Sequence, residues 1–306
     1  MTRTEEFTAL RPLLFAIAYR ILGSVGEAED AVQETWLRYE SSTTEPVSVK
    51  SFLSAVVTRI AIDTLRSARV RREVYVGPWF PEPLLTDPYS DPERSAELAD
   101  SVSMAALLLL ERLSPLERAV FVLREVFGFG FGEVAAAVER SEAACRQLAV
   151  RARRHMEQGR PRFDADRRER EELATRFFDA LRDGDVHGLT ELLAADVQAV
   201  ADGGAKGPAL TRPVVGSGNV ARLIAGFASL THGLVAVEQH RVNEQPGAVL
   251  RDGEGAVVAV MVLDVLDGRI QTIRSVVNPD KLEHLGPVAD AWRLRAEAQA
   301  RRRPRR

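Results

Sequence analysis

The character of the sequence changes near Glu169. Before that point the apolar residues recur mostly at intervals of three and four, as on one face of an amphipathic helix. After it, the helical segments LATRFFDALRDG, DVHGLTELLAAD and GSGNVARLIAGFASL are joined by runs such as LVAVEQHRV and AVVAVMVLDVL, which are typical of strands, with Asp-Gly pairs at 252–253 and 267–268 that predict hairpin turns. We therefore expect an all-α part, followed by an α+β part in which helices pack on an antiparallel, curved sheet.

The helical part is interrupted by the stretch YVGPWFPEPLLTDP, residues 75–88. Proline and glycine do not continue a helix and are typical of a linker. A flexible linker has no use for two large rings, however, and Trp79 and Phe80 stand in its middle. We expect all-α domains at residues 1–74 and 101–160, a proline-rich linker at 75–100, and an α+β domain with a tail at 161–306.

Charge and composition narrow the class of protein. The net charge of −3 does not favour nucleic-acid binding, but arginine clusters at Arg66–Glu73, at Arg146–His155 and in the terminal RRRPRR, and two of these clusters fall on predicted helices. No apolar run approaches a membrane span, and acidic residues occupy the flank where a signal peptide is positive. The single cysteine, Cys145, excludes an intrachain disulfide and is expected to pack between helices, so a cytoplasmic protein is predicted.

Residues 133–158 form a candidate helix-turn-helix. Three alanines at 135–137 let two helices cross closely, a tight turn is expected at Glu139–Arg140, and a longer helix follows. That helix presents Arg146, Gln147, Arg151 and Arg153. Arginine suits guanine and phosphate, and glutamine can read adenine, so this helix is a candidate for the major groove. The alternative is an ordinary helical hairpin with a solvated basic face.

Three segments in the first half carry a resemblance. LRPLLFAIAYRILGSVGEAEDAVQETWLRYE, VKSFLSAVVTRIAIDTLRS and LSPLERAVFVLREVFGFGFGEVAAAVERSEAACRQLAVRARR occur in the order and with the gap of bacterial sigma factors of the extracytoplasmic-function (group IV) type. The resemblance covers about half of the chain. It implies two partners, core RNA polymerase and promoter DNA, and a protein that opens DNA strands and catalyses nothing itself.

The same resemblance implies roles for individual residues. The helix expected to dock on the core polymerase carries Asp30, Gln33, Glu34 and Trp36, with a solvated acidic face as the alternative. The helix expected to bind the −10 element carries Arg59, Asp63, Arg66 and Arg69, and Ser42–Lys50 corresponds to a loop that captures a flipped base. The −35 element is expected to meet Arg146, Gln147, Arg151 and Arg153.

The second half resembles the SnoaL-like, NTF2-like fold, a cone of helices and curved sheet around a pocket. Its pairing with sigma domains is similar to the sigma-J subgroup, in which the motifs W-L-P-E-P, D-G-G-G-K and N-P-D-K-L occur. This chain has GPWFPEPL in the linker, DGGAK at 202–206 and NPDKL at 278–282, with Ala205 in place of a glycine. Alanine resists a positive φ, so this departure matters if the position needs one.

Together these motifs predict a shared regulatory surface. Its residues are Trp79, Phe80, Pro81, Glu82, Asp202, Lys206, Asn278, Asp280 and Lys281. The two rings are expected to bury against the polymerase, the C-terminal domain or each in turn; simple packing on one sigma domain, a strand-end turn at Asp202 and a loop cap at Asn278 are the local alternatives. The C-terminal domain is expected to modulate activity in place of a separate anti-sigma protein, with its basic tail disordered, on DNA phosphates, or folded back as a helix.

Other classes of function stay open at this point. The C-terminal fold also houses cyclases, isomerases and hydrolases, and the candidate acid–base residues are Asp185, Asp202, His240, Asp264 and Arg274. Asp264 and Arg274 fall on neighbouring predicted strands that can face one pocket. Neither a compact nucleophile nor a metal-ligand spacing occurs, so no cofactor is predicted, and a pocket that binds an unknown small molecule, or nothing, is favoured over an enzyme. A stand-alone helix-turn-helix repressor is the remaining alternative.

Overall fold

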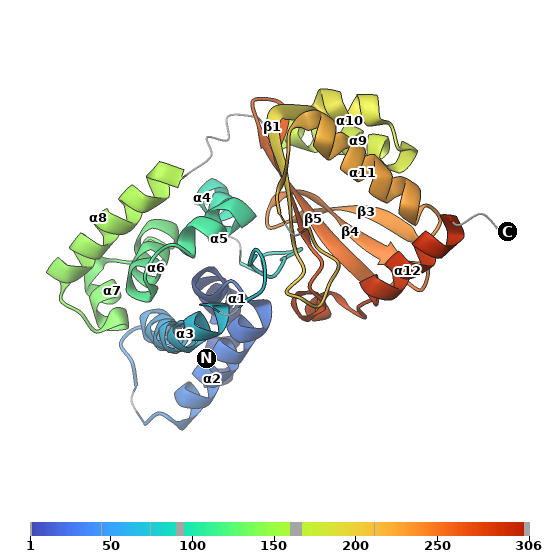
Figure 1. Cartoon of the computed structure of the whole chain (residues 1–306). Coiled ribbons are helices and arrows are strands. Elements are labelled where there is room, and N and C mark those ends of the chain that lie inside the picture. Colours follow the sequence, from blue (N-terminus) through green and yellow to red (C-terminus); the bar gives the residue numbers. More distant parts are fainter. Residues whose placement is uncertain are drawn as a thin grey trace. The chain divides into compact units, whose positions relative to one another are not determined.

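The structure is a computed structural model that describes residues 2–43, 45–73, 75–89, 95–159, 167–210 and 212–302. The chain forms two compact units (Figure 1). The N-terminal unit consists of Met1–Val74 and Thr86–Arg160, and the C-terminal unit of Tyr75–Leu85 and Pro161–Arg306. The stretch expected to be a linker is therefore divided, because its first part belongs with the C-terminal unit.

Helices make up the N-terminal unit, as the apolar spacing predicts. They are α1 (Arg3–Leu22), α2 (Val25–Ser41), α3 (Val49–Glu73), α4 (Ser95–Val102), α5 (Met104–Leu110), α6 (Pro115–Phe121), the π-helical turn η2 (Val122–Val126), α7 (Phe131–Val138) and α8 (Glu142–Gly159). Side chains cap several of them. At α6, Ser114 Oγ accepts from the backbone N–H of Glu117 while the glutamate reaches back to the N-cap, with Pro115 at the first position.

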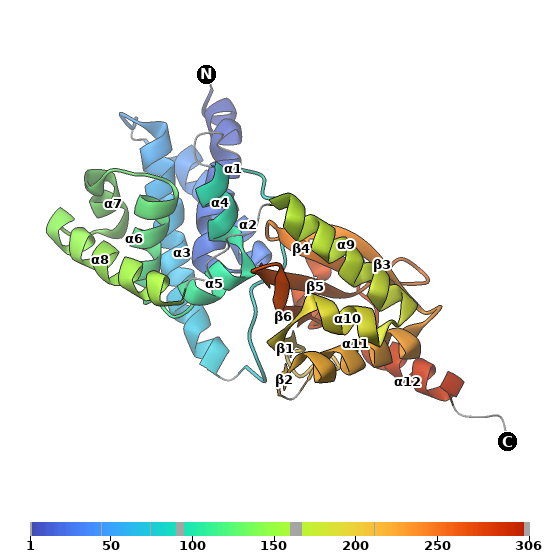
Figure 2. The same ribbon diagram turned by 90° about the horizontal axis from the view of Figure 1, so that it is seen from above.

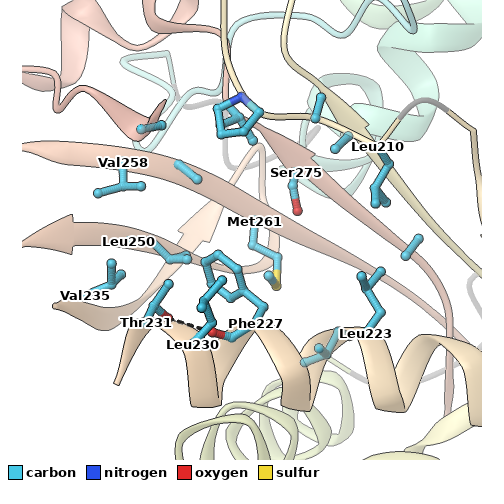
Figure 3. A pocket seen from close by; sticks show the side chains of 18 of the residues that line it. Leu210, Leu223, Phe227, Leu230, Thr231, Val235, Leu250, Val258, Met261 and Ser275 are labelled. Atoms are coloured by element: carbon cyan, nitrogen blue, oxygen red, sulfur yellow. Dashed lines mark hydrogen bonds between the residues drawn. The ribbon is translucent and has the colours of Figure 1, made fainter. Parts of the chain in front are cut away.

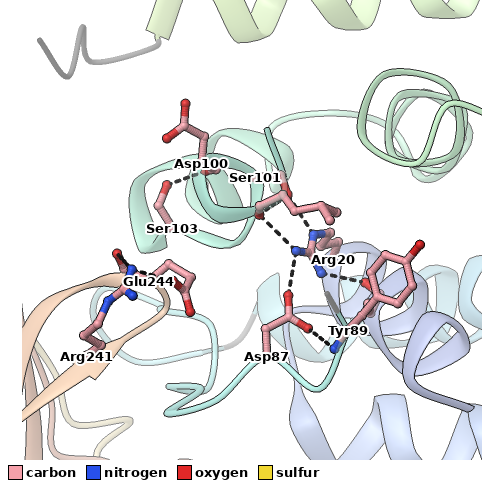
Figure 4. A network of polar contacts seen from close by, with 10 residues as sticks. Arg20, Asp87, Tyr89, Asp100, Ser101, Ser103, Arg241 and Glu244 are labelled. Carbon is pink, nitrogen blue, oxygen red and sulfur yellow. Dashed lines mark hydrogen bonds and ion pairs between the residues drawn. The ribbon is translucent and has the colours of Figure 1, made fainter. Parts of the chain in front are cut away.

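Two buried arginines join α1 to the later helices of this unit. Arg20 is fully buried and donates to Asp87 Oδ2 at 2.8 Å and to the carbonyl of Leu98 at 3.0 Å (Figure 4). Arg118 on α6 donates to the carbonyls of Ile21 at 2.6 Å and of α5. A buried charge is tolerated only when it is paired and hydrogen-bonded, so these contacts hold the two helical segments in one arrangement.

The C-terminal unit is an α+β domain, which confirms the predicted fold class. Its elements are α9 (Arg167–Asp183), α10 (Val186–Leu192), β1 (Leu193–Asp202), β2 (Val214–Val215), α11 (Ser217–Thr231), β3 (Val235–Val242), β4 (Gln245–Asp252), β5 (Val257–Leu266), β6 (Arg269–Val276), the 3-10 turns η3 (Pro279–Lys281) and η4 (Glu283–Leu285), and α12 (Ala291–Arg302). The strand order is β2-β1-β6-β5-β4-β3. The expected antiparallel sheet contains one parallel pair, β1 with β6.

Helices α9, α10 and α11 lie along one face of this sheet (Figures 1 and 2). Phe177 and Phe178 on α9 are fully buried and pack edge to face, with ring centroids 5.2 Å apart. Strand side chains that point to the helices complete the core, among them Leu263 and Ile273. The predicted turn at Asp267–Gly268 closes the β5–β6 hairpin with φ of 50° and 66°.

Candidate functional site

The segment Tyr75–Leu85 docks on the C-terminal unit around one buried carboxylate. Asp202 ends β1 and is fully buried. Its Oδ2 accepts from the backbone N–H of Phe80 at 2.8 Å and from Lys281 Nζ at 2.7 Å, and its Oδ1 accepts from the hydroxyl of Tyr75. Three donors around a carboxylate without solvent compensate for its lost hydration.

Lys281 is the cation of this cluster and is almost as buried, with 8% of its side chain exposed. It lies in η3 and also donates to the carbonyl of Phe80. Its Nζ stands 4.2 Å from the ring centroid of Trp79 and 4.7 Å from that of Tyr75. The lysine is thus enclosed by one carboxylate, one carbonyl and two aromatic faces, each of which stabilises a positive charge.

The apolar side chains of the segment bury against the same unit. Phe80 and Leu84 are buried. The backbone N–H of Leu84 donates to Asn243 Oδ1 at 3.0 Å, and the backbone N–H of Asn243 donates to the carbonyl of Leu84 at 2.7 Å. The carbonyl of Pro83 lies 2.7 Å from His284 Nε2. Of the partners left open by the sequence, the structure places Phe80 against the C-terminal domain, with Trp79 half-buried over the lysine.

The turn after Asp202 has the backbone that its glycines allow. A Cβ on Gly204 would lie 2.4 Å from Asn278 Nδ2 and 2.6 Å from the hydroxyl of Tyr75, so no other residue fits there. Ala205 has a φ of +62°, the left-handed region that alanine resists. The substitution of alanine for the subgroup's glycine therefore falls on a position that does need a positive φ.

The remaining residues of the predicted regulatory surface lie around this cluster. Asn278 caps η3 by accepting from the N–H of Asp280 at 3.2 Å, and it donates to the Tyr75 hydroxyl at 2.8 Å. Lys206 and Asp280 form an exposed ion pair at 2.7 Å. Pro81 is buried and Glu82 half-buried.

Tyr75 belongs to this cluster although sequence reasoning did not single it out. Burial raises the pKa of its phenol above the ordinary value, and the hydrogen bond to the Asp202 carboxylate raises it further. The residue therefore stays protonated and donates to Asp202 throughout the neutral range. Its aromatic character at the start of the proline-rich stretch, beside Trp79, was the one signal that could have pointed to it.

Helix α8 presents the residues predicted to read the −35 element. These are the exposed Arg146, Gln147, Arg151 and Arg153. Arg146 pairs with Glu142 on its own helix at 2.7 Å, whereas the next two arginines pair with Glu117 at 3.0 Å and Glu125 at 2.8 Å, on preceding elements. Arg146 also lies over the ring of Phe131 on α7, 4.9 Å from its centroid, so each of the three arginines is held in place by a neighbouring group.

The helix-turn-helix itself has the predicted form. Helices α7 and α8 flank a turn in which Glu139 takes a left-handed φ of 54° and Arg140 N–H donates to the carbonyl of Ala135. Cys145 is fully buried on the inner face of α8, as expected, and burial raises its pKa. This face anchors α8 and leaves the basic face outward.

The predicted −10 helix, α3, meets α7. Arg59 donates to the carbonyls of Ala136 at 2.6 Å and Ala137 at 3.1 Å, at the C-terminal end of α7, where helix carbonyls attract a cation. Farther along α3, Arg66 and Asp63 form an exposed pair at 3.1 Å. The side chain of Arg69 lies outside the described residues, and so does Thr44 in the Ser42–Lys50 loop.

On α2, the residues predicted to meet core polymerase lie on two faces. Asp30 and Gln33 are exposed, and Glu34 pairs with Arg38 at 2.8 Å. Trp36 instead packs half-buried against Phe7, with ring centroids 5.0 Å apart. The apolar residues of α2 predict one buried face that holds Val32, Trp36 and Leu37.

That expectation for Leu37 is wrong. Its side chain is 52% exposed. It follows Asp30, Gln33 and Glu34 at helical spacings of seven, four and three residues, so the four side chains share one outer face. Sequence reasoning missed this apolar member of the surface.

A cavity of about 540 Å³ lies between the sheet and α11 and α12 (Figure 3). None of the candidate acid–base residues lines it. Arg274 lies between Ile273 and Ser275, which do line it, and therefore points to the opposite face of β6, where it pairs with Asp264.

Asp264 and Arg274 do lie together on neighbouring strands, but on the face of the sheet opposite this cavity. The other candidates have structural places. Asp185 caps α10, Asp202 holds the Tyr75–Leu85 segment, and His240 is exposed on β3. Among the described residues, no group of three His, Cys, Asp or Glu side chains is arranged to hold a metal ion.

Comparisons with known proteins identify the family. The sigma-70 region 2 model matches residues 7–71, and the sigma-70 region 4 model matches residues 103–156. The ECF RNA polymerase sigma factor SigJ of Mycobacterium tuberculosis is 38% identical over 287 residues, which cover 90% of this chain and 92% of that protein. The chain belongs to the ECF RNA polymerase sigma factors.

Two further matches span nearly the whole of this ECF sigma factor. The probable ECF sigma factor SigI of M. tuberculosis is 32% identical over 285 residues, covering 92% of this chain and 95% of that protein. The crystal structure of M. tuberculosis SigJ aligns with a TM-score of 0.71 at 33% identity, covering 92% and 98% of the two chains. The C-terminal unit is therefore part of what the relatives share.

Membership decides between the classes of function left open above. An ECF sigma factor recognises promoters and initiates transcription with RNA polymerase, so the chain is a transcription factor and not an enzyme. Its partners are core RNA polymerase and promoter DNA. In the part of the chain that the structure describes, no helix has the length and apolarity that a membrane crossing needs.

Proposed function

We propose that this ECF sigma factor engages polymerase and promoter through three surfaces of its N-terminal unit. The outer face of α2, with Asp30, Gln33, Glu34 and Leu37, docks on the core polymerase, and Trp36 holds that face in place from below. Helix α3 binds the −10 element through Arg59, Asp63, Arg66 and Arg69. Helix α8 enters the −35 major groove with Arg146 and Gln147 on base edges and Arg151 and Arg153 nearer the phosphates.

Arg59 on α3 contacts α7 in the free protein, and this contact affects its access to DNA. Arg59 is tied to the end of α7 by two hydrogen bonds, so it is not available to DNA until α7 moves. Hydrogen bonds to a charged, partly exposed group contribute about 1–3 kcal/mol each. The free protein then rests in a closed form, and contacts with polymerase and promoter phosphates have to exceed this amount to open it in the holoenzyme.

We further propose that the C-terminal unit regulates these surfaces in place of a separate anti-sigma factor, in the cytoplasm. The observation that carries this is the buried Asp202–Lys281 pair that holds Phe80. The chain leaves the N-terminal unit after α3, is fixed in the C-terminal unit at Tyr75–Leu85, and then returns toward α4. Any change in the C-terminal unit that releases this segment alters the connection between the helices before it, which include the −10 helix α3, and the helices after it, which include the −35 helix α8.

The test is transcription in vitro with core RNA polymerase, on promoters selected by the holoenzyme from a library randomised at −10 and −35. Full-length wild type is compared with Lys281→Met, which breaks the buried pair. Lys206→Met is the matched control, since it removes the exposed lysine of the same predicted surface and leaves the buried pair intact. We expect Lys281→Met alone to change the promoter-specific transcript yield severalfold at equal core binding.

Equal yields from all three proteins would refute regulation through the segment, and failure of wild type to bind core would refute the docking surface on α2. The −35 assignment has its own check. Arg146→Ala should relax the −35 preference of the selected promoters, whereas Arg182→Ala, an exposed arginine on α9, should leave it unchanged.

A further inference from the structure

The cavity of the C-terminal unit is lined mostly by apolar side chains. Its floor is the sheet, with Leu250, Val258, Met261 and Ile273, and Leu223 on α11 faces them (Figure 3). A volume of about 540 Å³ falls within the range of small-molecule sites in proteins. At about 30 Å³ for each water-sized group, it holds on the order of 15–20 non-hydrogen atoms.

Few polar groups face the interior. The hydroxyl of Thr231 is already committed to the carbonyl of Phe227 at 2.9 Å, and the hydroxyl of Ser275 stands on the sheet wall. The described lining contains neither aspartate nor glutamate. A cationic ligand would therefore find no counter-charge, and a strongly polar one would lose its hydration without replacement.

Positive charge is found at the edge of the cavity. Arg222 on α11 and Arg295 on α12 both line it and are both exposed. Arg222 donates to the side-chain oxygen of Asn219, and Arg295 stands 5.8 Å from the ring centroid of Trp292. Among the described residues, no ion pair to a carboxylate involves either guanidinium, so both retain capacity for an anion.

We propose that this cavity binds a small apolar carboxylic acid, with its hydrocarbon body against the sheet and its carboxylate at Arg222 and Arg295. A single chain of about twelve carbons fits within this volume. A two-chain lipid has more than twice the atoms that fit, so the ligand is a free acid and not a membrane lipid.

Helix α12 is expected to become more stable when a ligand fills the cavity. It supplies Ala291, Leu294 and Arg295 to the cavity, so a ligand adds contacts along the helix. Trp292 on the same helix donates through Nε1 to the carbonyl of Lys206 at 2.8 Å, in the turn that follows Asp202. A bound acid should therefore slow the backbone amide exchange of α12.

Calorimetric titration of the full-length protein tests the proposal with three probes of equal length: dodecanoate, 1-dodecanol and dodecylammonium. We expect one dodecanoate per chain, bound at least tenfold more tightly than the alcohol, and no saturable binding of the ammonium. Arg295→Ala should weaken dodecanoate severalfold without affecting the alcohol. Arg293→Ala, an exposed arginine on the same helix that does not line the cavity, is the matched control.

A filled cavity completes the test. Ala259→Phe places a ring in the cavity and should abolish dodecanoate binding. If circular dichroism shows this variant to be unfolded, Leu223→Trp, which fills the cavity from the opposite wall, is used instead. Absence of saturable dodecanoate binding to wild type would overturn the proposal. Equal affinity for acid and alcohol would overturn the anionic assignment, and binding that survives the filled cavity would overturn the location.

Discussion

Replacing Lys281 by methionine is the sharpest test of how the Tyr75–Leu85 segment is held. Methionine keeps the length and the apolar stem but removes the ammonium group. Asp202 then keeps two donors, the hydroxyl of Tyr75 and the N–H of Phe80, and loses the cation that pairs with it in a buried site. The carbonyl of Phe80 loses its donor as well.

The magnitude follows from burial. Removing one partner of a buried ion pair costs about 3–5 kcal/mol, because the other charge stays desolvated. An exposed pair such as Lys206–Asp280 contributes at most about 1 kcal/mol. Both variants remove one lysine from an ion pair, and the difference between them measures the contribution of the buried cluster around Lys281.

Hydrogen exchange at single-residue resolution measures this in the intact chain. The Phe80 N–H is bonded to Asp202, so its protection reports the docking directly. At about 1.4 kcal/mol for each tenfold change, Lys281→Met should speed its exchange about a hundred- to a few thousand-fold, and Lys206→Met less than tenfold. The pair Asp202→Asn with Lys281→Met should recover much of the lost protection, because no buried charge then remains.

Unchanged exchange at Phe80 in Lys281→Met would refute the reasoning, since it would mean that the segment is held without the ion pair. A double variant no better protected than the single one would also count against it, because the cost would then come from lost packing and not from an uncompensated carboxylate.

Three other outcomes are expected. Ala205→Gly should raise the stability of the C-terminal unit by about 0.5–1 kcal/mol, because glycine adopts its φ of +62° without strain, whereas Gly204→Ala should destabilise it; thermal melting compares the two. Because the pKa of Tyr75 is raised on folding, its stabilising effect should be complete below about pH 10 and should disappear as the pH rises through the raised value; Tyr75→Phe should remove that alkaline loss, which unfolding at a series of pH values detects. Arg59→Ala should accelerate amide exchange at the end of α7, whereas Arg66→Ala, which pairs within its own helix, should not.

Local signals in the sequence predicted much of the fold. The Ser114–Glu117 cap and the Asp267–Gly268 turn are short-range chemistry, and both occur as expected. Two features depend on distant residues and were not predictable. One is the turn at Asn243 and Glu244, which have φ of 52° and 59° although a glutamate rarely takes that conformation. The other is the parallel pairing of β1 with β6, which depends on how the chain between these strands is connected.

The candidate site was predictable to the extent that motifs carried it. The three motifs of the sigma-J type were expected to share one surface, and Phe80, Asp202 and Lys281 do meet. Asp264 and Arg274 were expected on neighbouring strands, and they do pair. The face of the sheet that carries the cavity was not predictable, because a shift of one residue in a strand reverses the face of every side chain, and the pair lies on the opposite face.

The place of residues 75–85 in the C-terminal unit affects how this domain can be gained or lost in evolution. A domain that only follows another can be gained or lost by a single break in the gene. Here the C-terminal fold is completed by eleven residues encoded between the two sigma modules. The module can travel to another sigma factor only if an insertion and an extension arrive together, so linker and C-terminal domain are expected to share one ancestry.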